Sequence, residues 1–308
     1  MPTSVHDPTD SLTTTADGPE HADEPTDISA EGWLAVAKRV VDRLKTDHVA
    51  LFAAGVAFFA FLATIPGMIA LVSIYGLFGD ASAVERRVDD LAGTLPAEAR
   101  DLIVQQLESI TASSGSALTL GLVVSIGVAL WSASSGMGHL IEAVNVAYRL
   151  TEQRGFLARR ALALVFTLGA VLFIGVVIGV ITALPAVLAA ADLPSTARWA
   201  ISLAVWPLIG VGMAIGLALL YRFGPNREPD PRWTWVTPGA IVAVVGWLLA
   251  SIAFQIYAAN FGTYNETYGS LAAVVVLLLW LWISALMVLI GAETNSELER
   301  QTSASTTE

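Results

Sequence analysis

The sequence contains no cysteine, and only four histidines occur in its 308 residues. The absence of cysteine excludes disulfide bonds, thiolate catalysis and cysteine-ligated metals. The histidines, at positions 6, 21, 48 and 139, are scattered, and no HxH, HExxH or aspartate-rich metal motif accompanies them. We therefore predict neither a metal site nor another cofactor.

Charge is also scarce, since Asp, Glu, Lys and Arg make up 14% of the chain where about 25% is usual in soluble domains. Hydrophobic residues make up 55%, and the mean hydropathy is +0.65. These values are typical of a membrane protein. The net charge of -11 argues against a nucleic-acid surface. Membrane lipids are the expected partners, and nucleic acid is not.

Six stretches contain no Asp, Glu, Lys, Arg or His, and each has the roughly 20 apolar residues that a helix needs to cross the hydrocarbon core. Because these apolar runs are continuous, helices are favoured over a barrel, whose strands would alternate apolar and polar residues. The sequence predicts an all-α polytopic membrane protein with six transmembrane helices. The spans are expected at about 49–78, 117–137, 161–184, 199–221, 236–257 and 270–292.

Successive connections between spans lie on opposite sides of the membrane, and the Lys and Arg residues are divided unevenly between these two sides. Four of the sixteen, at positions 86, 87, 100 and 198, lie on one side. The other twelve are Lys38, Arg39, Arg43, Lys45, Arg149, Arg154, Arg159, Arg160, Arg222, Arg227, Arg232 and Arg300. Because positive charge near span ends stays on the cytoplasmic side, both termini are predicted to be cytoplasmic in a protein of the plasma (inner) membrane.

The segments outside the spans differ in composition. Residues 1–30 hold seven acidic residues and no basic one, which predicts a disordered acidic tail, and 301–308 are expected to be a second disordered tail. Between them, 31–300 form the membrane domain. Its outer connection, 80–116, has two apolar stripes and is predicted to form short surface helices. The amphipathic segment 28–48 predicts an interfacial helix beside anionic lipid.

Polar residues precede the sixth span in the stretch YNETY. Tyr264 and Tyr268 are typical of the outer membrane interface. Asn265 can cap the helix that follows, and Glu266 complements the positive end of its dipole. This structural interpretation accounts for most of the pattern. The functional alternative is a helix start that faces the bundle and binds an anion or a head group, with Asn265 as a ligand.

The sixth span also has a polar and aromatic stripe. Trp280 and Ser284, with Asn295 beyond the end of the span, recur at helical spacing on one face. Polar side chains are unfavourable on a helix face that contacts lipid. We therefore expect this face to point into the bundle, where it is a candidate substrate or structural site.

Two carboxylates lie at the ends of spans. Glu142 follows the second span on a stripe with Asn145 and Arg149, and Glu293 ends the sixth. A carboxylate near hydrocarbon is costly unless it is paired. Glu142 is therefore expected to pair with Arg149 or with a cation from another connection, and Glu293 to have a similar partner. A transport or proton-coupling role is the alternative hypothesis.

Two further features concern the course and packing of helices. Pro66 lies inside the first span, where its missing N–H and its ring predict a kink or break near Thr64. A break could line a substrate site, and a kink could serve packing alone. Small residues four apart, Gly175 with Gly179 and Gly212 with Gly216, allow close helix contacts within the chain or between copies in a homo-oligomer.

Several stretches together carry a family resemblance. They are AAGVAFFAFLATIPGMIALVSIYGLFG, LWSASSGMGHLIEAVNVAY followed by EQRGFLARRALAL, FGPN with WTWVTPGA, and YNETYGSLAAVVVLLLWLWISALMVLIGAETNSELE. In this order, over roughly residues 33–300, the chain resembles the YihY/BrkB family of inner-membrane proteins. The resemblance implies six spans. Some members carry the old label ribonuclease BN, and others are described as serum-resistance or lipid-related membrane proteins.

The residues argue against the nuclease label. RNA hydrolysis usually needs clustered carboxylates with metal ions, or His and Lys in an exposed cleft with a cationic surface. We expect no ribonuclease activity and no enzymatic activity. The favoured hypothesis is a transporter or a protein that translocates lipid or another amphiphile. The alternative is a membrane scaffold or assembly factor that transports nothing.

Overall fold

A computed structural model describes residues 28, 30–78, 116–191, 193–227, 233–259 and 270–304. Within these ranges the chain is all-α, as predicted. The helices are α1 (Ala30–Thr46), α2 (Val49–Phe78), α5 (Ser116–Ala147), α6 (Phe156–Ala190), α7 (Ser195–Phe223), α8 (Trp233–Ala259) and α10 (Ser270–Ala304). Each predicted span falls within one helix, from α2 to α10.

Four of the described helices, α6, α7, α8 and α10, are long and apolar enough to cross a membrane. A fifth span results if α1 and the first half of α2, which meet at an angle of 66°, are counted as one broken span. The chain is therefore a polytopic membrane protein. The count of six remains a prediction from the sequence.

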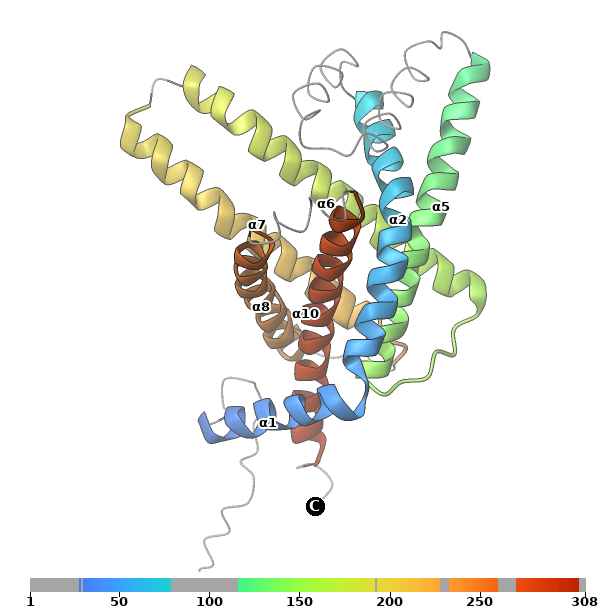
Figure 1. Ribbon diagram of the computed structural model, residues 1–308, viewed down its shortest axis with the longest axis vertical. Helices are drawn as coiled ribbons and strands as arrows, with labels where there is room; N and C mark the ends of the chain where they lie inside the picture. The colour runs from blue at the N-terminus through green and yellow to red at the C-terminus, as the bar shows by residue number, and fades with distance from the viewer. Residues whose placement is uncertain are drawn as a thin grey trace, which may run out of the picture.

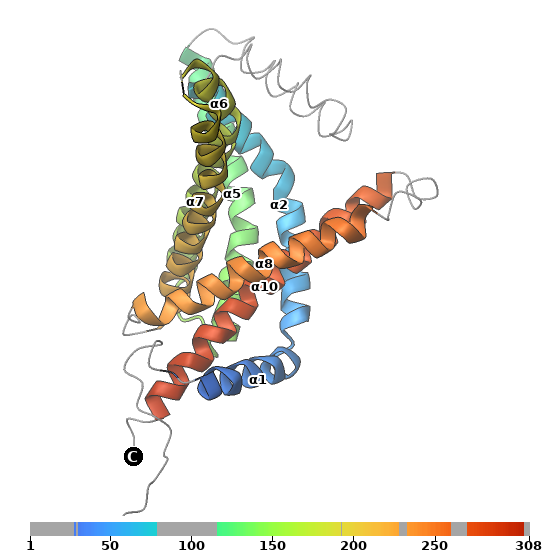
Figure 2. The ribbon, with the colours of Figure 1, turned by 90° about the vertical axis from the view of Figure 1, so that its left-hand side faces the viewer.

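Helix α2 packs along α5 and α10, and α10 also packs along α8. The hairpin of α6 and α7 leans away from the α2–α5 pair in Figure 1. Figure 2 shows that α8 and α10 cross the upright pair at a steep tilt, while α1 lies across their lower end. Large apolar side chains on α6 and α7, such as Val176 and Leu208, are exposed, as expected of surfaces that face lipid.

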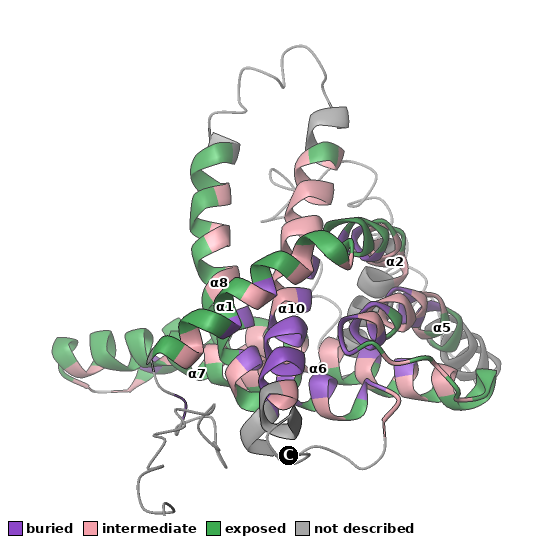
Figure 3. Cartoon of the chain, turned by 90° about the horizontal axis from the view of Figure 1, so that it is seen from below, coloured by how far each residue is buried: buried purple, intermediate pink, exposed green. Residues whose placement is uncertain are grey.

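The densest packing lies at one end of the bundle, which we call the basic end because the arginines of α1, of α6 and of the α5–α6 and α7–α8 connections gather there. Figure 3 shows the buried residues concentrated on the last part of α10 at this end. Every residue from Gly291 to Leu298 is buried, including polar and charged side chains. This end of the molecule is therefore a polar core closed by hydrogen bonds and ion pairs.

Two glycines allow α8 and α10 to cross at close range. A Cβ atom on Gly239 would overlap the carbonyl oxygen of Gly291, and one on Gly291 would overlap that of Gly239. Backbones this close exclude any larger side chain. Beside the crossing, the hydroxyl of Tyr221 in α7 donates to the carbonyl of Val288 (2.7 Å) and ties a third helix to α10.

Helix α1 is amphipathic, as predicted, and its apolar face packs on protein. Val36 and Val40 are buried against Leu298 of α10. On the polar face, Arg39 and Arg43 lie 3.3 and 3.2 Å from the carboxylate of Glu297. Helix α1 is thus attached to the end of α10 by both apolar and ionic contacts.

Of the kink or break expected near Thr64 the break is absent, and the expected C-terminal tail needs correction. Helix α2 runs through Pro66 without a break, although the ribbon changes direction in its upper half (Figure 2). One turn before the proline, the Thr64 hydroxyl donates to the Ala60 carbonyl (2.9 Å), a contact that often accompanies helix bending. Helix α10 continues to Ala304, so residues 301–304 of the expected C-terminal tail are helical.

Other predictions fall outside the described residues. These are the acidic tail up to position 27, the outer connection over 80–115, and the YNETY stretch with Tyr264, Asn265, Glu266 and Tyr268. They remain predictions.

Candidate functional site

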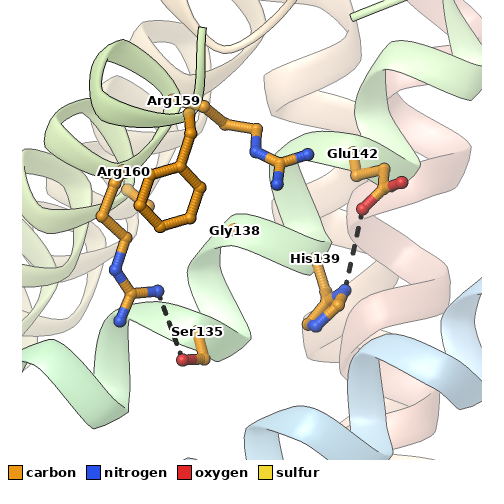
Figure 4. Close-up of a pocket in the computed structure, with 8 residues that line it drawn as sticks. Ser135, Gly138, His139, Glu142, Arg159 and Arg160 are labelled. Carbon is orange, nitrogen blue, oxygen red and sulfur yellow. Dashed lines mark hydrogen bonds and ion pairs between the residues drawn. The ribbon is translucent and has the colours of Figure 1, made fainter.

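A cavity of about 130 Å³ lies between α5 and α6 at the basic end. Helix α5 contributes Ser135, Gly138, His139 and Glu142 to its walls, and α6 contributes Phe156, Arg159, Arg160 and Ala163. Figure 4 shows the two arginines entering from one side, with His139 and Glu142 opposite them. Because its walls carry two arginines, a histidine and a carboxylate, we take it as the candidate site.

Helical spacing explains why these side chains converge. Ser135, His139 and Glu142 are separated by four and three positions, so they lie on one face of α5. On α6, Phe156, Arg160 and Ala163 are likewise separated by four and three positions. Gly138 and Ala163 lie between the polar groups, and a Cβ on Gly138 would be 3.9 Å from the Ala163 methyl group. These small residues leave the space that the polar side chains border.

Arg160 is held in place by three contacts. Its Nη1 donates to Ser135 Oγ (3.2 Å), and its Nη2 donates to the carbonyl of Trp131. The guanidinium also lies over the Trp131 ring, 4.1 Å from its centroid. Such a cation–π contact favours a charged guanidinium beside the indole. Arg160 therefore presents a fixed positive charge to the cavity.

The side chain of Arg159, by contrast, makes no hydrogen bond or ion pair with the part of the chain that the structure describes. Its guanidinium points across the cavity toward Glu142 (Figure 4). Glu142 Oε2 lies 3.7 Å from Nδ1 of His139, one turn earlier on α5. The His139 ring in turn stacks on Phe59 of α2 at 3.6 Å. The cavity holds two guanidinium groups against one carboxylate, which favours an anion.

The expected pairing of Glu142 with Arg149 is wrong. Arg149 lies 3.3 Å from Asp47 instead, and so joins the end of α5 to the turn between α1 and α2. The stripe predicted from the sequence assumed that the helix continues to Arg149, whereas α5 ends at Ala147. With a φ of 56°, Arg149 lies in the left-handed region, so its side chain leaves the stripe that a continuing helix would give.

Asn145 belongs to a neighbouring network that fixes the connections. Its Oδ1 accepts from the backbone N–H of Asn226 (2.7 Å), and its Nδ2 donates to Glu152 (3.0 Å). Arg154 pairs with Glu152 at 2.6 Å and also donates to the carbonyl of Gly224. The hydrogen bond from Arg154 holds the pKa of Glu152 below its ordinary value of 4.5. Asn145 thus has a structural role in joining the α5–α6 connection to the end of α7.

Glu293 does not have the ionic partner expected from the sequence. The residue is 1% exposed, and its Oε1 has no hydrogen-bond partner among the described residues. The arginines nearby are used elsewhere, because Arg149 pairs with Asp47, and Arg39 and Arg43 with Glu297. Glu293 is therefore a buried carboxylate that forms no ion pair with the described residues, although the charges of Arg149 and Arg300 act on it from farther away. It lies one turn from Glu297, a carboxylate that has two cations.

The inward stripe of α10 is present and holds α8. Asn295 accepts from the Gly239 N–H (2.7 Å) and donates to the Val236 carbonyl (3.0 Å). Farther along, Trp247 Nε1 donates to Ser284 Oγ (2.9 Å), which donates to the carbonyl of Trp280. Trp280, Ser284 and Asn295 thus connect two helices and lie away from the α5–α6 cavity.

Sequence reasoning missed most of the cavity, including Ser135, His139, Arg159 and Arg160. One signal could have revealed it, because two adjacent arginines stand near the start of α6 with no acidic residue in the first turn. No group of three or more His, Asp or Glu side chains that could hold a metal ion occurs in the described ranges.

The fold and the cavity define a polytopic helical membrane protein with a basic site at one end of its helices. Comparison with known families is specific: the profile described as "Virulence factor BrkB" matches residues 40–308. The chain therefore belongs to the BrkB family of membrane proteins, as the resemblance in the sequence implies.

Curated relatives agree with this assignment. A protein of Bacillus subtilis named "ribonuclease-like protein YfkH" is 30% identical over 80% of this chain and 89% of its own length. A UPF0761 membrane protein of Alteromonas mediterranea is 26% identical over 84% of this chain and 85% of its own length. Another, from Vibrio atlanticus, is 26% identical over 89% of this chain and 85% of its own length. No solved structure matches the chain.

Proposed function

We propose that this protein translocates a lipid or a lipid-like amphiphile across the membrane. One observation carries the proposal: a charged cavity opens beside exposed apolar side chains. Trp131 and Phe156 at its edge are 47% and 67% exposed, and Leu157 next to them is 77% exposed. A polar group in the cavity could thus keep an apolar tail against the helix surface, as an amphiphile requires.

The proposed orientation places the basic end in the cytoplasm, with six spans and both termini inside the inner membrane. Support comes from the gathering of Arg39, Arg43, Arg149, Arg154 and Arg227 at one end, where each contacts another part of the polar core. Positive charge on one side of the spans is the usual mark of the cytoplasmic face.

A vesicle assay tests translocation. The purified full chain is reconstituted into liposomes that contain phosphatidylglycerol or phosphatidylethanolamine with a fluorescent nitrobenzoxadiazole label on one acyl chain. Dithionite, which does not cross the bilayer, bleaches only the outer leaflet of protein-free vesicles. We expect bleaching to proceed into the inner-leaflet pool when the protein is present. Bleaching that stops at the protein-free level for both lipids would reject the proposal.

The alternative function is a scaffold, and the glycine faces favour it. Gly179 of α6 and Gly216 of α7 have open space where a Cβ would project, whereas Gly212 packs on Phe173 within the chain. The open positions could accept a second copy in a homo-oligomer. A scaffold would leave the vesicle assay unchanged, and Gly216→Leu would then disrupt assembly and cell phenotype together.

We propose no ribonuclease activity for this chain, although the Bacillus relative is named ribonuclease-like. The net charge of -11 disfavours RNA binding. Incubation of the purified protein with structured RNA, with and without divalent cations, is expected to give no cleavage above buffer controls. Cleavage that co-purifies with the protein would overturn this part of the proposal.

A further inference from the structure

The start of α6 has an electrostatic conflict that an anion would relieve. Gly155, the residue before the helix, provides no side-chain hydrogen bond to the first N–H groups, and the first turn has no acidic residue. These N–H groups and the helix dipole give that end a partial positive charge. Arg159 and Arg160 add two full positive charges close to it. Glu142, which is the carboxylate in the cavity wall, balances only one of them.

The two arginines are positioned for different roles. Arg160 is fixed by Ser135 and Trp131, so its charge is present in the cavity before any ligand arrives. The guanidinium of Arg159 has no partner in the described ranges and can direct its donors to a ligand. A planar guanidinium donates two parallel hydrogen bonds to the oxygens of a phosphate or carboxylate group.

The size of the cavity limits what can enter. A volume of about 130 Å³ is well below the 300–1,000 Å³ or so of sites that take drug-sized molecules. It is several times the roughly 30 Å³ of one water molecule in the liquid. A phosphate-sized group fits, and a whole lipid does not. The exposed Trp131 and Phe156 continue the edge of the cavity as an apolar surface on which acyl chains can lie.

From these observations we infer that the cavity binds the phosphate group of an anionic phospholipid, with its acyl chains outside against α5 and α6. The inference rests on the proposed function in that it names the class of amphiphile moved. Arg159 and Arg160 donate to the phosphate oxygens. Glu142, across the cavity, repels the same phosphate and so limits its affinity, which a translocator needs if the lipid is to leave.

Binding is measured on the full-length protein in detergent by native mass spectrometry, with dipalmitoyl phosphatidylglycerol as the probe. Arg159→Gln should weaken binding roughly tenfold or more, because a hydrogen bond to a charged group is lost. Glu142→Gln should tighten it about two- to fivefold, since one repulsive charge is removed. Lys38→Gln, which removes an exposed cation of α1, is the matched control and should leave affinity unchanged.

Two further probes test the ligand chemistry. Palmitate, an anionic amphiphile with a carboxylate in place of the phosphate, should bind more weakly than phosphatidylglycerol, because it offers fewer oxygens to the two guanidinium groups. Inorganic phosphate should compete for the site only at much higher concentration, which supports a lipid as its source. Competition by inorganic phosphate at the affinity of the lipid would overturn the lipid assignment, and equal binding of palmitate would overturn the phosphate assignment.

The opposite signs expected for Arg159→Gln and Glu142→Gln separate a binding site from a structural role. If Arg159→Gln fails to fold, the gain in Glu142→Gln still decides the matter, because damage to the structure would not tighten binding. Equal affinity in wild type and Glu142→Gln, together with no loss in a folded Arg159→Gln, would refute the inference. Because detergent binding requires no transport, normal binding with no lipid movement in vesicles would reject only the proposed function.

Discussion

Asn295→Ala should destabilise the contact between α8 and α10 more than any neighbouring truncation. The Asn295 side chain makes two buried hydrogen bonds to the backbone of α8, one to the Gly239 N–H and one to the Val236 carbonyl. Pro238 lies between these two residues and provides no N–H of its own. The side chain therefore ties the backbone of α8 to α10 in the turn that contains this proline.

Each lost hydrogen bond that leaves a buried group unpaired costs at least about 1 kcal/mol. Two such losses give about 2 kcal/mol, which for a large domain lowers Tm by about 4–8 °C. Thermal unfolding of the purified protein in detergent, followed by tryptophan fluorescence, measures this shift. Ser296→Ala truncates the adjacent buried residue and should lower Tm by at most about half as much. Equal shifts for the two variants would refute the argument that Asn295 pairs the backbone of α8.

Three other outcomes follow from the structure. Gly291→Val should prevent normal folding and lower the yield of monodisperse protein, because the new side chain would overlap the α8 backbone. A yield equal to that of the wild type would contradict the close crossing of α8 and α10. Since the Arg154 contact lowers the pKa of Glu152, this pair stabilises the fold above about pH 4.5, and the stabilisation is lost as pH falls below that value. Glu152→Gln should therefore flatten this part of the profile of Tm against pH. A profile equal to that of the wild type would exclude a stabilising role for the pair. An impermeant maleimide on intact cells should label Thr196→Cys and spare Lys38→Cys, because the first is at the opposite end from the basic core; the reverse pattern would invert the proposed orientation.

The course of the helices was accessible from the sequence because it depends on local composition. Long uncharged runs require helices in a bilayer, where each backbone polar group must be paired within its own segment. All six predicted spans accordingly lie in described helices. The amphipathic pattern of 28–48 likewise predicted α1. What it could not give was the partner of the apolar face, since packing of Val36 on Leu298 joins residues far apart in the chain.

The polar sites were predicted less well, because their partners depend on how the helix ends turn. Asn295 was predicted to face the bundle, and it is buried. Asn145 and Glu293, which were candidate polar residues at the ends of spans, are buried as well. Of the two kinds of partner expected for Glu142, Arg149 was wrong, since a helix that ends at Ala147 turns Arg149 toward Asp47. The cavity itself needs α5 and α6 side by side, and no periodicity within either helix reveals that they face each other.

The most direct test of the central claim, that the α5–α6 cavity recognises the translocated amphiphile, is the rate of lipid movement in vesicles that contain Arg159→Gln. The dithionite assay with labelled phosphatidylglycerol is run on wild type, Arg159→Gln and Lys38→Gln at equal protein content. If the cavity takes the head group, Arg159→Gln should slow inner-leaflet bleaching roughly tenfold, while Lys38→Gln keeps the wild-type rate. Equal rates in all three proteins would show that lipid crosses elsewhere and would contradict the account.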